Sequence, residues 1–129
     1  VYCRGSAVTY WNSAKEHILG VSAETLAAHT AVSRETAREM ADGSRFLYGA
    51  DIAVSTTGYA GPGRGERGEP EGLVYIGVSG WDGTEVHEEH FLGSRKSVRY
   101  GAAEKALFYA AEYIRNHEPP RGGGAKEAQ

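Results

Sequence analysis

Residues 73–91, which read LVYIGVSGWDGTEVHEEHF, decide the fold class of this chain. Leu73–Ser79 is a short apolar run with β-branched and aromatic residues, as is typical of a strand. Thr84–Phe91 is a second extended run, and the Asp82-Gly83 pair between the two is a strong signal for a hairpin turn. The segment therefore predicts two strands that pair antiparallel.

The flanking segments supply helices on both sides of this hairpin and more extended structure before it. Pro119-Pro120 ends the last helix. The order predicts an α/β domain with helices on both faces of a sheet, and the sheet must be mixed because the hairpin forces an antiparallel pair. Further strands are predicted at Val1–Tyr10 and Ile52–Thr57. Helices are predicted at Ser13–Leu19, capped by Asn12, and at Ser22–Ala28 and Ser33–Tyr48, each capped by its first serine. The last predicted helix is Lys96–Asn116, and the residues along one of its faces are Val98, Ala102, Leu107, Ala111 and Ile114.

Composition narrows the class of protein. The chain has 129 residues, of which 40% are hydrophobic and 24% charged, and this fits one compact domain. A net charge of -3 gives no basic excess, so nucleic acid is not an expected partner. No apolar run is long enough for a membrane span, and Cys3, the single cysteine, is predicted to be a small buried hydrophobe in a cytoplasmic protein.

Two polar segments resemble ligand motifs. Gly63, Gly65 and Gly68 match G-x-G-x-x-G, but Pro70 and a strand follow instead of the helix that a dinucleotide site needs. The loop Gly58–Glu71 still follows a strand, where α/β proteins often bind ligands, although a flexible surface loop is the alternative. His87 and His90 are predicted to face opposite sides of a strand, so no metal site is expected.

Four stretches of the sequence form a recognisable series. They are VTYWNSAK at 8–15 with ILGV at 18–21, TAVS at 30–33 with Ala37 and Met40-Ala41, TGYAGP at 57–62 with PEGLV at 70–74, and FLGSRKSVR at 91–99. In this order they resemble the C-terminal domain of the CinA (competence/damage-inducible) family. The resemblance implies a three-layer α/β/α sandwich, and we expect a mixed, mainly parallel sheet containing one antiparallel hairpin. Family members hydrolyse the carboxamide of nicotinamide mononucleotide to nicotinate mononucleotide and ammonia, and no cofactor is implied.

The resemblance also implies site residues. Tyr10 and Lys15 match the catalytic tyrosine and lysine, and the substrate-binding residues would be Thr57, Gly58, Ala60, Gly61 and Arg99, the last in preference to Arg95. A lysine acts as a base only when it is neutral, and a place in the first turn of a helix, together with burial, would lower its pKa. Otherwise Lys15 is a solvated helix lysine and Tyr10 an ordinary aromatic. Arg64 and Arg67 are further candidates for binding a phosphate.

The chain departs from the family at the nucleophile. The family's serine lies in an Ala-Glu-Ser-x-Thr-Gly-Gly motif ahead of the tyrosine, and residues 1–129 do not contain it. Either an upstream segment supplies it, as the start at Val1 in mid-strand suggests, or the protein is an inactive nucleotide-binding or assembly module. We expect an amidase-like domain at 1–118 that lacks its N-terminal segment, a disordered tail at 119–129, and a homo-oligomer.

Overall fold

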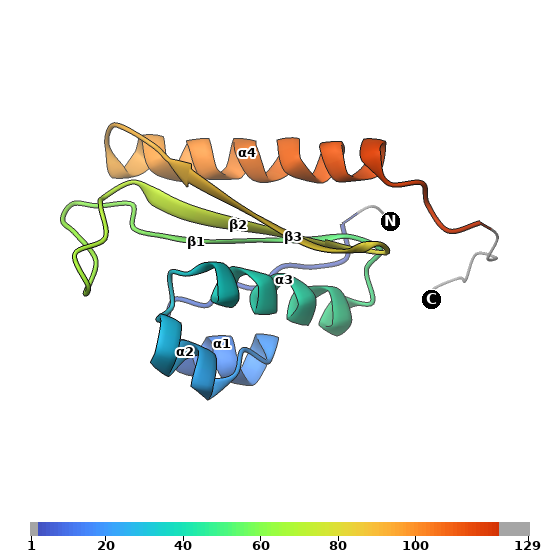
Figure 1. Cartoon of the computed structure of the whole chain (residues 1–129), viewed down its shortest axis with the longest axis horizontal. Coiled ribbons are helices and arrows are strands. Elements are labelled where there is room, and N and C mark those ends of the chain that lie inside the picture. The colour runs from blue at the N-terminus through green and yellow to red at the C-terminus, as the bar shows by residue number, and fades with distance from the viewer. Residues whose placement is uncertain (1–2, 122–129) are drawn as a thin grey trace.

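A computed structural model describes residues 3–121, and Figure 1 shows how its helices and strands are arranged. Val1, Tyr2 and most of the predicted tail, residues 122–129, lie outside the described residues. The elements in chain order are α1 (Asn12–Leu19), α2 (Ala23–His29), α3 (Arg34–Tyr48), β1 (Ala53–Gly58), β2 (Leu73–Gly80), β3 (Gly83–His90) and α4 (Arg95–Asn116).

The sheet has the order β1-β2-β3, and both pairings are antiparallel. The predicted hairpin is confirmed, since Gly80 pairs with Gly83 across the turn and Gly83 has a φ of 107°. The expectation of a mainly parallel sheet is not confirmed. A parallel pair needs a long crossover connection, usually a helix, whereas the loop 59–72 simply returns the chain from β1 to its neighbour β2.

Helices cover both faces of the sheet. Helix α4 lies along one face and α3 along the other, with α1 and α2 on the outer side of α3 (Figure 1). On the α4 face, Val74 and Ile76 of β2 form a buried cluster with residues of α4. On the α3 face, Gly77 lets the backbone of α3 approach closely, because a Cβ there would lie 2.6 Å from the carbonyl oxygen of Ala37.

The predicted helices are all present, with two corrections. Trp11, not Asn12, is the N-cap of α1, and Asn12 is already helical, whereas the serine caps of α2 and α3 are confirmed. In α4, Leu107, Ala111 and Ile114 are exposed and do not share the buried face of Val98 and Ala102, although one face is predicted for all five. The sheet contacts a stripe with steps of mostly four residues, to which these three residues do not belong. The stripe consists of Val98, Ala102, Ala106, Tyr109 and Tyr113.

The predicted first strand is wrong for residues 3–10, which have no regular secondary structure. A strand needs a neighbour to receive its backbone hydrogen bonds, and no such pairing occurs among the described residues. Side chains hold the segment instead: the Tyr48 hydroxyl donates to the carbonyl of Ser6 at 2.7 Å. Cys3 in this segment is exposed, not buried as predicted. One edge of β1 consequently has no strand beside it in residues 3–121.

Gly43 allows α1 to pack on α3, and replacing it should be strongly destabilising. A Cβ at this position would lie 1.7 Å from the backbone oxygen of Leu19, which cannot move away alone. We expect Gly43→Ala to lower the free energy of unfolding by about 2 kcal/mol or more, measured by urea denaturation, even though alanine favours a helix.

Gly101→Ala in α4 is the matched control for this prediction. It gains the same helix propensity, but its Cβ would meet the ring of Phe91, a side chain that can turn aside. The expected loss is smaller. Equal losses in the two variants would contradict the role assigned to the contact of Gly43 with Leu19.

His117 ties the end of α4 to the β2–β3 hairpin. Its Nδ1 lies 2.7 Å from Asp82 and its Nε2 3.0 Å from Glu85, and the hydrogen bonds to these two carboxylates raise the pKa of His117. A pKa raised by folding stabilises the folded state fully below the unfolded value, and this contribution is lost as the pH rises through the folded value. Thermal unfolding at several pH values should therefore show His117→Gln to be less stable than wild type at slightly acidic pH, with the difference shrinking towards alkaline pH. A difference that is constant with pH would contradict this.

Candidate active site

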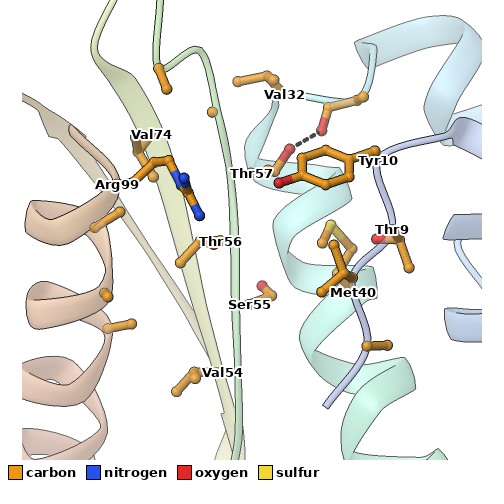
Figure 2. Close-up of a pocket in the computed structure, with 18 of the residues that line it drawn as sticks. Thr9, Tyr10, Val32, Met40, Val54, Ser55, Thr56, Thr57, Val74 and Arg99 are labelled. Carbon is orange, nitrogen blue, oxygen red and sulfur yellow. Dashed lines mark hydrogen bonds between the residues drawn. The ribbon is translucent and has the colours of Figure 1, made fainter. Parts of the chain in front are cut away.

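A cavity wraps around the edge of β1 that has no strand beside it in residues 3–121. Its volume is about 720 Å³, within the range of small-molecule sites. Figure 2 shows that alternate side chains of β1 point into two lobes. Val54 and Thr56 point towards α4, where Arg99 lies, and Ser55 and Thr57 point towards α3.

Lys15 is a buried amine in the α3 lobe. Only 6% of the residue is exposed, and its Nζ donates a hydrogen bond to the carbonyl of Thr9. Helical side chains lean towards the N-terminus of their helix, and this brings the amine back over the chain that enters α1. Burial lowers the pKa of Lys15. The alternative of a solvated lysine is therefore wrong, and burial shifts the pKa of this amine in the direction that a base requires.

Tyr10 lines the same lobe but is largely exposed, with 75% of its surface accessible. Figure 2 shows its ring on the α3 side of β1, the side towards which Thr57 points. The Thr9 carbonyl, and not the Tyr10 hydroxyl, holds the Lys15 amine among the described residues. A backbone carbonyl carries no sequence signal, because every residue has one.

Thr57 is 7% exposed, and its hydroxyl donates to the carbonyl of Ala31 at 2.6 Å. Gly58 and Ala60 also line the cavity. The position of Gly58 has no room for a side chain, because a Cβ would lie 2.6 Å from the carbonyl oxygen of Leu73. Gly61 does not line it. This residue has a φ of 92°, and its carbonyl accepts a hydrogen bond from Arg95 at 2.9 Å, so it shapes the loop.

The four candidate arginines differ in whether they already have a hydrogen-bond partner in the protein. Arg64 donates to the carbonyl of Gly68 at 3.0 Å, and Arg67 donates to that of Ala28 at 3.1 Å, so both hold the glycine-rich loop in place. Arg95 lines the cavity but is engaged with Gly61. Arg99, one turn into α4, lines the cavity and has no hydrogen-bond or ion-pair partner within residues 3–121. It is the cavity's guanidinium that is free to bind an anion.

The described residues contain no cluster of three or more side chains able to hold a metal ion. His87 stacks on Tyr109 of α4, whereas His90 pairs with Glu88, which also contacts Arg34 of α3. The two histidines thus face opposite sides of the sheet, as predicted. No helix in the described part of the chain is long and apolar enough to cross a membrane.

Comparison with known proteins identifies the family. The CinA C-terminal domain model matches residues 1–114. This chain belongs to the CinA family. A CinA-like protein of Syntrophomonas wolfei is 44% identical over 115 residues, which is 89% of this chain and 28% of that protein. A competence damage-inducible protein A from Klebsiella pneumoniae has a similar structure, with a TM-score of 0.80 and 40% identity over 86% of this chain and 68% of that chain.

A second CinA superfamily protein of K. pneumoniae gives a TM-score of 0.82 at 38% identity, over 84% of this chain and 68% of that one. The α/β fold of the CinA domain is therefore shared with solved structures. The chain spans about a quarter of the length of the curated relatives it matches.

Proposed function

We propose that this CinA domain binds nicotinamide mononucleotide and contributes to hydrolysis of its carboxamide, which gives nicotinate mononucleotide and ammonia. The observation that carries the proposal is the buried Lys15 amine, whose pKa is lowered by burial, in a cavity that also holds a free guanidinium. A neutral amine is the base that a serine amidase of the Ser-Lys type needs.

The two lobes match the two ends of the ligand. A phosphate would bind Arg99 on the α4 side of β1, since a guanidinium forms charge-assisted hydrogen bonds with phosphate oxygens. The pyridine carboxamide would then reach around the carboxyl end of β1 to Thr57, Tyr10 and Lys15. Gly58 and Ala60 also line the cavity, and their small size would leave room for the ring.

In the proposed chemistry the nucleophile would be the serine of the family's motif, which residues 1–129 do not contain. Neutral Lys15 would take the proton of this serine as its oxygen attacks the carboxamide carbon. The resulting ammonium would return the proton to the leaving ammonia, with Tyr10 as a relay. Water would then hydrolyse the acyl-enzyme and regenerate the serine.

The test is ammonia release from nicotinamide mononucleotide by the protein that the whole gene encodes. We expect turnover that depends on the enzyme concentration and yields one nicotinate mononucleotide for each ammonia. Absence of ammonia at high enzyme concentration, with the family's serine motif present, would contradict the amidase proposal.

An inactive nucleotide-binding or assembly module is the second candidate. It is favoured by the environment of Tyr10, which is 75% exposed and whose hydroxyl, among residues 3–121, does not hold the Lys15 amine. This candidate predicts a higher melting temperature with the mononucleotide but no turnover by the whole protein. A natural reading frame without a serine motif upstream would select it.

We also propose that the protein is a homo-oligomer. Large apolar side chains are exposed on the described surface, including Phe46 at 90%, Leu92 at 92% and Leu107 at 70%. Burial of such side chains stabilises an interface between subunits. Sedimentation velocity over a range of concentrations tests this, and a monomer at all concentrations would contradict it.

A further inference from the structure

The hydroxyl hydrogen of Thr57 is already engaged in a hydrogen bond within the protein. Its Oγ1 lies 2.6 Å from the carbonyl oxygen of Ala31, and a carbonyl can only accept. A hydroxyl carries one hydrogen and two lone pairs, so the hydrogen must point at Ala31. Towards any ligand in the cavity, Thr57 can therefore act only as an acceptor.

The turn that carries Ala31 is itself held rigidly. Thr30 has a φ of 68°, which is unusual for a residue with a side chain, and its carbonyl accepts from Thr36 at 2.7 Å and from Ser33 at 3.1 Å. Thr36 is completely buried. Rotating the Thr57 hydroxyl towards a ligand would leave the half-buried Ala31 carbonyl without its donor, which is unfavourable.

Ser55 repeats the arrangement two residues earlier on the same face of β1. Its hydroxyl donates to the carbonyl of Ala37 at 2.6 Å. The two hydroxyls that β1 directs into the α3 lobe thus present lone pairs to the cavity and no hydrogen.

We infer that Thr57 determines specificity for a carboxamide over the corresponding carboxylic acid. An amide N–H₂ group can donate a hydrogen bond to an obligate acceptor. A carboxylate oxygen has only lone pairs, and these would be repelled by the lone pairs of the Thr57 hydroxyl. The inference rests on the proposed function and deepens it, because it predicts that the site favours the substrate over the product and so promotes product release.

The test compares the two mononucleotides by titration calorimetry on the whole chain. The dissociation constants of nicotinamide mononucleotide and nicotinate mononucleotide are measured for wild type, Thr57→Val and Thr57→Ser. We expect wild type to prefer the amide, and Thr57→Val, which keeps the shape of the side chain, to bind the amide about tenfold more weakly with little change for the acid. Thr57→Ser retains the hydroxyl and should keep the preference.

Thr36→Val is the matched control, because it removes an equivalent hydrogen bond from a hydroxyl to a backbone carbonyl, that of Thr30, at a buried residue that does not line the cavity. We expect it to lower the melting temperature without changing the ratio of the two affinities. If Thr57→Val weakened the binding of both mononucleotides by the same factor, this would overturn the inference and leave Thr57 with a purely structural role. Wild type that binds both ligands equally would also overturn it, whereas wild type that binds neither would overturn the proposed function together with the inference.

Discussion

Lys15→Met should lower kcat for ammonia release by about 10³-fold, because the general base is lost and a positioned base typically contributes ~10²–10⁴-fold. The whole-gene protein is the enzyme for this measurement. Methionine fills the space of the lysine stem in a site that is only 6% exposed, so the fold should survive. Thermal unfolding of the variant checks this directly.

The pH profile separates a catalytic role from a structural one. The base must be neutral, so wild-type kcat should rise as the pH rises through the pKa of Lys15, which burial lowers below the usual lysine value. Lys15→Met should lose this rise, and Lys96→Met, at an exposed position on α4, should keep both the rate and the profile. A kcat for Lys15→Met within threefold of wild type would remove Lys15 from the mechanism.

Arg99→Ala should raise the dissociation constant of nicotinamide mononucleotide by about 10- to 100-fold. A charge-assisted hydrogen bond contributes about 1.5–3 kcal/mol, and in the unliganded protein Arg99 has no partner within residues 3–121 that would compensate. The loss should be absent for nicotinamide riboside, which lacks the phosphate. Calorimetry with both ligands measures the difference.

Arg95→Ala is the control for this prediction. Arg95 lies four residues away on α4 and lines the same cavity, but it is occupied with the carbonyl of Gly61. We expect a change of less than about threefold in mononucleotide affinity. If Arg95→Ala weakened phosphate binding more than Arg99→Ala, the assignment of the two arginines would be reversed.

The elements that the sequence predicts well are those with local signals. The Asp82-Gly83 turn and the serine caps of α2 and α3 each depend on a few neighbouring residues, and all are present. Residues 3–10 and the direction of the sheet depend on which strands are neighbours, and this is a property of the whole fold. A β-prone sequence without a partner strand does not become a strand.

In the candidate site, too, some features have a signal in the sequence and others depend on tertiary contacts. The family resemblance selected Lys15, Thr57 and Arg99, and all three line one cavity. The sequence could not predict that the Thr9 and Ala31 carbonyls hold two of these side chains, or that Arg64 and Arg67 are engaged by backbone oxygens. Those assignments depend on tertiary contacts between segments far apart in the chain.

If the proposed nucleotide binding and self-association both occur, the edge of β1 without a neighbouring strand in residues 3–121 would couple them. The cavity wraps around the same edge that could recruit another strand. Self-association along this edge and nucleotide binding would compete for one space, so each must weaken the other by the same factor. The apparent affinity for the nucleotide then becomes a function of protein concentration, and a dilution series links the quaternary state to occupancy of the site.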